Sequence, residues 1–204
     1  MPEIGLFPLP LVLLPTERVP LHVFEPRYRE LVSECLAEGR ELGVLLEDEQ
    51  GRRQVGTRAA VVEVLEVFPD GRMNVVVEGR DRFRLVRLTQ GRSFLTAQVE
   101  RVTDAAEPPP TASEIGTARR LFRQLVEMAE ADVDEPDGSS GSLSFELAAR
   151  VGFGLAAKQG LLELRSERAR LRRLAVLLEG AVAAVTRARE VRERATGNGR
   201  VSAG

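Results

Sequence analysis

The apolar positions near the start of the chain predict short extended segments. Residues 4–29 are strongly apolar, yet Pro8, Pro10, Pro15 and Pro20 each remove a backbone N–H donor and fix φ. A continuous helix across this run is therefore excluded, and with it a membrane-spanning segment. The pattern predicts strands of a few residues that are joined at prolines.

The first helix is predicted over residues 26–38. Pro26 suits the first turn of a helix, and Gly39 stands where a C-terminal cap is expected. Between them, apolar side chains recur at spacings of three and four, which places them on one face; they are Tyr28, Leu31, Val32, Cys35 and Leu36. This stripe predicts that the helix packs against a core.

Residues 42–102 have the composition and the imperfect alternation of strands. The turn residues 69–71, Pro-Asp-Gly, predict a hairpin formed by residues 61–68 and 73–78. Gly79 predicts a bulge or a bend. Strands are predicted over residues 42–46, 54–68, 73–78, 82–88 and 94–102. We therefore expect a mainly-β half with one inserted helix, arranged as a closed or nearly closed barrel.

Helical spacing dominates after the Glu-Pro-Pro-Pro segment at residues 107–110. Thr111 and Glu114 have the spacing of a capping box, so a helix is predicted from about residue 112 to residue 130. An acidic, flexible loop is predicted over residues 132–141. Further helices are predicted around residues 145–151 and 156–163 and from Ser166 onward.

These elements predict an α+β fold, in which an N-terminal mainly-β, barrel-like domain with one helix precedes a C-terminal helical bundle. The predicted boundaries are residues 1–106 for the β-rich domain, 107–110 for a proline linker, 111–190 for the helical subdomain and 191–204 for a disordered tail.

Composition narrows the possible partners and location. The 204 residues carry a net charge of −2, so overall charge gives no reason to expect a nucleic acid or an anionic membrane as partner. Cys35 is the only cysteine, which excludes an intrachain disulfide. The start of the chain lacks the pattern of a secretory signal, so a cytoplasmic location is expected.

The candidate phosphate, zinc and calcium sites do not have the residues or the spacing that such sites require. The chain has no phosphate-binding G-x-x-x-x-G-K-[ST] motif, and its single histidine, His22, and single cysteine cannot supply a zinc site. The acidic loop has Pro136 where the fifth ligand position of a calcium loop would be. His22 is expected to form a structural hydrogen bond near Glu25 or to the backbone. We therefore expect no enzymatic activity, no catalytic residues, no metal and no cofactor.

Three segments resemble the N-terminal substrate-binding domain of the Lon protease family. They are Leu-Phe-Pro-Leu at residues 6–9, Pro-Leu-His-Val-Phe-Glu-Pro-Arg-Tyr at 20–28, and Val-Val-Glu-Gly-Arg-Asp-Arg-Phe-Arg at 76–84. The resemblance implies a free-standing version of that domain, without the ATPase and peptidase modules of full-length Lon proteases. It also implies a PUA-like barrel, related to those of pseudouridine-synthase-type proteins.

The resemblance implies a non-enzymatic module that recognises unfolded polypeptide or a partner protein, as a monomer or weak dimer. Binding would bury apolar side chains in surface grooves, with strand addition at a sheet edge as a further mode. The candidate contacts are apolar residues beside turns: Phe7, Leu13, Leu14, Phe68 and Met73. The alternative for each of them is a position in the core, because apolar residues are usually buried.

An RNA-binding module is the alternative. Arg80, Arg82 and Arg84 share strand parity and would line one face of the barrel, where they could contact phosphates. Neighbouring strands carry balancing carboxylates, however, and aromatic residues for stacking on bases are scarce. These two features favour the polypeptide hypothesis over the RNA hypothesis.

Overall fold

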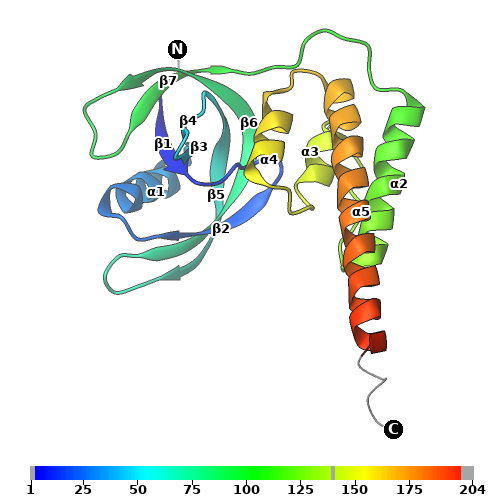
Figure 1. Ribbon diagram of the computed structural model, residues 1–204. Coiled ribbons are helices and arrows are strands. Elements are labelled where there is room, and N and C mark those ends of the chain that lie inside the picture. Colours follow the sequence, from blue (N-terminus) through cyan, green and yellow to red (C-terminus); the bar gives the residue numbers. More distant parts are fainter. Residues whose placement is uncertain (1–2, 139–140, 199–204) are drawn as a thin grey trace. The chain divides into compact units, whose positions relative to one another are not determined.

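The computed structural model describes residues 3–138 and 141–198, which divide into two compact units (Figure 1). The chain up to Ala106, together with Ala148–Arg165, forms the β-rich unit. Glu107–Leu147 and the chain from Ser166 onward form the helical unit. In the described residues the strands are mostly antiparallel and five helices accompany them, which confirms the predicted fold class. The relation to pseudouridine-synthase-type barrels stays a prediction.

The β-rich unit is a closed barrel with two additional strands. Strands β1, β7, β6, β5 and β3 pair in that order, and a parallel pairing of β1 with β3 closes the ring. Strand β2 pairs with β6 outside the ring, and β4 extends β3. The strands are β1 (Glu3–Leu9), β2 (Arg18–Val23), β3 (Leu42–Asp48), β4 (Gly51–Arg52), β5 (Val55–Val67), β6 (Met73–Thr89) and β7 (Thr96–Arg101).

The barrel interior depends on two glycines that contact the Phe83 ring. A Cβ atom on Gly56 would lie 2.8 Å from the Phe83 ring and 2.4 Å from the Val44 carbonyl oxygen. A Cβ atom on Gly43 would lie 3.0 Å from the same ring. Any larger residue would therefore displace the aromatic side chain at the centre of a small apolar cluster, whose buried members are Ile4, Leu6, Leu45, Phe83, Ala97 and Val99.

Helix α1 (Pro26–Glu38) begins and ends where the sequence predicts. Pro26 occupies the first turn, and Gly39 adopts the left-handed conformation, with φ of 63°, that ends the helix. Four of the five predicted stripe residues are buried, whereas Leu36 is exposed. The buried face packs in a larger cluster that includes Phe7, whose ring lies 4.3 Å from that of Tyr28, centroid to centroid.

Strand β6 runs through Gly79 instead of ending there. A Cβ atom on Gly79 would lie 2.1 Å from the Leu14 carbonyl oxygen, so glycine allows the backbone of the segment after β1 to cross the strand closely. The pairing of β5 with β6 is irregular opposite this point. The strands predicted separately over residues 73–78 and 82–88 are therefore one strand.

Residues 148–165 lie in the β-rich unit, although the sequence placed them in a continuous helical subdomain over 111–190. Helix α4 (Leu155–Glu163) buries Leu161 and Leu162, and its Gln159 donates to the Val55 carbonyl at 3.1 Å. Lys158 forms an ion pair with Glu17, a residue that precedes β2. Val55 and Glu17, the polar partners of α4, are thus on the barrel, which accounts for the place of this segment in the β-rich unit.

The helical unit contains α2 (Ala112–Ala129), α3 (Leu143–Ala148) and α5 (Glu167–Asn198). The predicted capping box is present, since Thr111 accepts from the Glu114 backbone N–H while the Glu114 carboxylate accepts from the Thr111 backbone. These contacts, with Arg168 and Arg172, lower the pKa of Glu114 to about 2. Helices α2 and α5 pack against each other through buried leucines.

Two predictions about flexible segments change. Arg119 contacts the Glu135 carboxylate and the carbonyls of Pro136 and Asp137, so residues 135–137 of the acidic loop are anchored to α2. Helix α5 continues to Asn198, because residues 191–196 are mostly strong helix formers although few are apolar. The predicted tail is therefore helical as far as Asn198. Residues 139–140 and 199–204 lie outside the described residues. None of the described helices is long and apolar enough to cross a membrane.

Candidate functional site

Four of the five predicted contact residues are buried. Phe7, Leu13, Leu14 and Met73 are each at most 7% exposed, and only Phe68 is partly exposed. The expectation that they remain accessible beside turns is therefore wrong for these four. Phe7, Leu13 and Met73 belong to the same core cluster as the buried face of α1.

The arginine face predicted for RNA does not form a continuous basic surface. Arg82 is 6% exposed and donates to the carbonyls of Leu162 and Leu164 at 2.9 and 2.6 Å. It also forms an ion pair with Asp104 at 2.5 Å. Its guanidinium thus joins β6 to the end of α4, within the β-rich unit, and is not available to phosphates.

The other two arginines face carboxylates. Arg80 pairs with Glu78 at 2.6 Å, and Arg84 lies 3.7 Å from Glu100. Parity along β6 predicted that the three arginines would share a face, but burial separates the middle one from the others. The three arginines therefore do not form the single basic face that the RNA alternative assumed.

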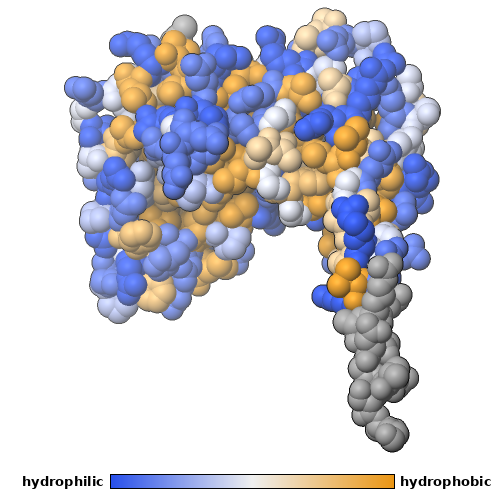
Figure 2. Space-filling model, viewed as in Figure 1, coloured by the Kyte–Doolittle hydropathy of each residue, from blue (hydrophilic) through white to orange (hydrophobic). Residues whose placement is uncertain are grey.

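One group of exposed apolar side chains lies at the far end of the β5–β6 hairpin. Val64, Leu65 and Val67 are 42%, 52% and 64% exposed, and Val62 is exposed as well. Phe24, which follows β2, is also exposed. In Figure 2 apolar surface is visible among hydrophilic residues over the β-rich unit. We call the exposed apolar set the hairpin patch; it consists of Phe24, Val62, Val64, Leu65, Val67 and Phe68.

Two register shifts create this patch. The β5–β6 pairing is irregular between Val61 and Glu63 and again between Val64 and Glu66, so Val62 and Leu65 stand outside the regular alternation. Val64 and Val67 pair with Val75 and Met73, two buried residues of β6. The inward face of the sheet thus continues past the part of the core that covers it.

A row of polar side chains crosses the opposite face of the same strands. Asn74 donates through Nδ2 to the Glu66 carboxylate at 3.2 Å, and its Oδ1 lies 2.7 Å from His22 Nδ1. Since Oδ1 is an acceptor, His22 donates from Nδ1. The His22 ring stacks on Phe24 at 5.9 Å and meets Phe68 edge-on at 6.1 Å. His22 therefore has a structural role, with Asn74 as partner and not Glu25.

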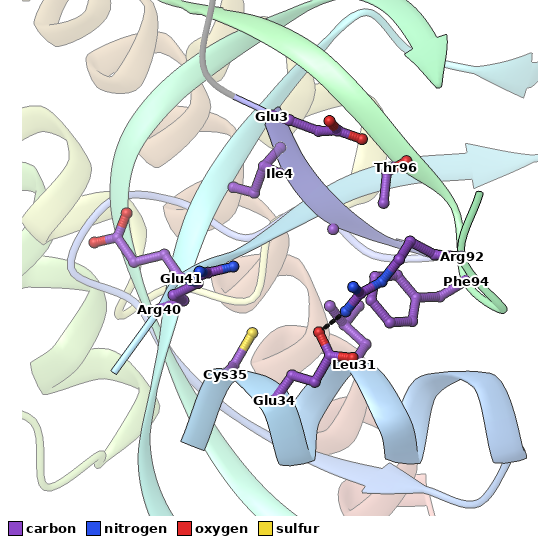
Figure 3. A pocket seen from close by; sticks show the side chains of 11 residues that line it. Glu3, Ile4, Leu31, Glu34, Cys35, Arg40, Glu41, Arg92, Phe94 and Thr96 are labelled. Carbon is purple, nitrogen blue, oxygen red and sulfur yellow. Dashed lines mark hydrogen bonds and ion pairs between the residues drawn. The ribbon is translucent and has the colours of Figure 1, made fainter. Parts of the chain in front are cut away.

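A separate hollow of about 250 Å³ lies between α1 and strand β1 (Figure 3). Arg92 and Glu34 form an ion pair across one side, as the dashed line shows. Burial raises the pKa of the Cys35 thiol at its edge to about 11, so the nucleophilic thiolate is scarce at neutral pH. The described residues contain no group of three or more potential metal ligands. Nothing in this hollow forms a catalytic arrangement.

A model of the ATP-dependent protease La (LON) substrate-binding domain matches residues 3–180. The chain belongs to this family. The segments at residues 6–9, 20–28 and 76–84 predicted this relationship correctly.

Relatives of the LON domain include whole Lon proteases. Lon protease 2 of Syntrophobacter fumaroxidans is 25% identical over 175 residues, which cover 79% of this chain and 22% of that protein. The Lon protease of Xanthomonas oryzae pv. oryzae is 32% identical over 140 residues, which cover 63% of this chain and 16% of that protein. The chain thus spans about a fifth of the length of the relatives it matches.

Solved LON domains have the same fold. The Lon N-terminal domain protein from Xanthomonas campestris aligns with a TM-score of 0.67 and 25% identity, covering 86% of this chain and 98% of that one. The N-terminal domain of the Mycobacterium avium complex Lon protease aligns with a TM-score of 0.65 and 19% identity, covering 89% and 98%. This second likeness supports the fold alone.

Sequence analysis missed most of the hairpin patch. The signal was present in Val-Val-Glu-Val-Leu-Glu-Val at residues 61–67, where two glutamates stand three positions apart and break a period of two. A break of this kind within a strand is typical of a bulge. Recognising it would have placed apolar side chains on both faces of the hairpin.

Proposed function

We propose that this LON domain is a non-enzymatic recognition module that binds exposed polypeptide segments on the hairpin patch. The observation that carries the proposal is the set of exposed apolar side chains at the far end of the β5–β6 hairpin. Burying apolar area releases about 25 cal/mol per Å², so even a short apolar segment gains from covering this surface. We propose further that the chain acts in the cytoplasm as a monomer or weak dimer.

The matched relatives support the polypeptide as ligand, because a substrate-binding domain of a protease is named for contact with proteins. The absence of a phosphate-binding motif from the sequence supports a role without ATP hydrolysis. Purified protein is expected to hydrolyse neither ATP nor casein above a buffer control. Turnover that follows this chain through purification would contradict the non-enzymatic role.

A binding titration with reduced, alkylated lysozyme tests the main claim. Val64→Ser combined with Val67→Ser should weaken binding severalfold, because two apolar contacts are lost from the patch. The matched control is Val86→Ser combined with Leu88→Ser, which alters two exposed apolar residues near the C-terminal end of β6. Equal loss in both double variants, or no loss in the first, would overturn the assignment to the hairpin patch.

The same titration with a single-stranded RNA separates the two classes of ligand. Phosphate contacts release counterions, so RNA affinity would fall steeply as salt rises. Binding of the unfolded protein should change much less between two salt concentrations, since apolar burial carries it. Tight, salt-sensitive binding of RNA without binding of the unfolded protein would contradict the proposed function.

A further inference from the structure

Strand β5 has one unoccupied edge beside the hairpin patch. On one side it pairs with β6 along nearly its whole length. On the other side its pairing with β3 covers Thr57–Ala59 only. From Ala60 to Val67, no other strand of the described chain pairs with this side of β5. The backbone N–H and C=O groups along this edge are therefore a template for another strand.

The side chains along this edge differ between the two faces of the sheet. Val64 and Val67 are on the face of the buried residues of β6, where they continue the apolar surface. Glu63 and Glu66 are on the opposite face, where they pair with Val76 and Asn74. Both glutamates are exposed, and within the residues that the structure describes neither forms an ion pair. At its regularly paired positions the edge is thus apolar on one face and acidic on the other.

This distribution disfavours a second copy of the chain as the occupant. If two β5 edges paired antiparallel around residues 64 and 65, Glu63 of one copy would stand opposite Glu66 of the other. Like charges directly opposite each other destabilise a strand pair. The two register shifts also twist the edge, which disfavours docking of another flat, preformed sheet. A flexible segment can follow this twist.

We infer that the β5 edge binds an extended segment of unfolded polypeptide as an added strand, with apolar residues beside Val64 and Val67 and lysine or arginine beside Glu63 and Glu66. This inference rests on the proposed function and specifies its substrate class. Main-chain hydrogen bonds to β5 supply affinity that is independent of sequence, and alternate side chains supply the preference. Ion pairs between these basic residues and Glu63 or Glu66 add modestly to the binding free energy, because exposed ion pairs contribute little.

A defined peptide tests the backbone contacts. The probe is an acetylated and amidated heptapeptide, Lys-Val-Lys-Val-Lys-Val-Lys, with a fluorophore at one end. In an extended strand, N–H groups of alternate residues point to opposite edges. Three N-methylated forms are compared with the parent: one methylated at the valines, one at the lysines, and one at both. Methylation removes the donors while keeping the side chains.

The added strand predicts an asymmetric result. The fully methylated peptide should lose at least about tenfold in affinity, because neither of its edges can donate to β5. At least one of the two partly methylated peptides should keep affinity within about threefold of the parent, since its free edge still pairs. The one that keeps binding also reports the direction of the added strand.

Charge reversal tests the preference for basic segments. Glu63→Lys combined with Glu66→Lys should lower the affinity for the parent peptide by about threefold to tenfold. The same double variant should raise the affinity for a peptide that has glutamate in place of lysine. Glu49→Lys combined with Glu107→Lys is the matched control, because both are exposed glutamates outside β5. The control should leave both affinities unchanged.

The outcomes separate this inference from the proposed function. If the unfolded protein binds at the hairpin patch but the fully methylated peptide binds like the parent, strand addition is wrong and apolar recognition stands. Loss of binding by all three methylated peptides also overturns strand addition, because the effect would not depend on an edge. If neither the unfolded protein nor the parent peptide binds, both proposals fail.

Discussion

The two ends of the β5–β6 pair have the same antiparallel pairing but differ in solvent exposure. At the barrel end, most of Val55–Ala59 and Gly79–Phe83 is buried, although Arg80 and Asp81 are exposed. At the hairpin end, residues 62–67 are all exposed although their β6 partners alternate regularly between buried and half-buried. Strand pairing alone therefore does not decide burial. The two ends of β5 differ in their second partner. The barrel end also pairs with β3 through Thr57–Ala59, whereas the hairpin end pairs with β6 alone among the described strands.

The contrast also appears in residue choice. The barrel end uses Gly56 and Gly79 where neighbouring atoms approach closely, so substitution there meets the backbone. The hairpin end has Val62, Val64 and Val67, residues of a type that is enriched in strands. Stability should depend on the first region and binding on the second.

Phe83→Ala should produce the largest loss of stability. The ring is fully buried and contacts Gly43 and Gly56, so its removal leaves a cavity that the closed barrel cannot easily fill. The expected cost is about 3–5 kcal/mol in the free energy of unfolding. Urea denaturation followed by circular dichroism measures it. A cost below about 1 kcal/mol would show that the barrel end relaxes as freely as the hairpin.

Val75→Ser should produce the next largest loss. Val75 is fully buried on β6, directly opposite the exposed Val64. Its replacement loses apolar burial and places a hydroxyl in the core, at an expected cost of about 2–4 kcal/mol. The same denaturation experiment applies. If Val75→Ser costs no more than Val64→Ser, the two faces of this row are not as different as the structure indicates.

Thr57→Val isolates a single polar contact at the barrel end. Thr57 is fully buried and its hydroxyl donates to the Leu13 carbonyl at 2.5 Å. Valine keeps the shape but leaves that carbonyl without this donor, which should cost about 1–2 kcal/mol. Thr57→Ser, which keeps the hydroxyl, is the control and should retain the hydrogen bond. Equal denaturation midpoints for Val and Ser variants would argue against an important role for this bond.

Val64→Ser should change stability least. The side chain is already largely in water, so its loss should change the free energy of unfolding by no more than about 0.5 kcal/mol. Its effect should appear instead in the binding of unfolded protein. A large stability loss here would mean that Val64 is covered in solution, which would contradict the hairpin patch.

Local patterns were sufficient for much of the fold. Pro26, Gly39 and the apolar stripe between them correctly predicted α1, and Pro-Asp-Gly at residues 69–71 correctly predicted the hairpin. The capping box at Thr111 correctly placed the start of α2. In each case the residues that define the element lie inside it or directly beside it.

Burial could not be derived in the same way. Alternation shows that two faces of a strand differ, but it does not show which face another element covers. Arg82 has the parity of Arg80 and Arg84, yet α4 approaches only at Arg82 and buries it. Met73 stands beside a turn like an exposed residue, but β2 and the core cover it. The return of α4 depends on partners such as Lys158 and Glu17, which are far apart in sequence.

The position of α4 has a consequence for biosynthesis. Because Ala148–Arg165 belongs to the β-rich unit, that unit is complete only after the ribosome has translated Glu107–Leu147 and then Ala148–Arg165 itself. At about 5–20 residues per second, this delay lasts a few seconds. During that time Arg82 lacks the carbonyls of Leu162 and Leu164, and Glu17 lacks Lys158. During synthesis, the barrel strands therefore emerge before α4 can supply these contacts to Arg82 and Glu17.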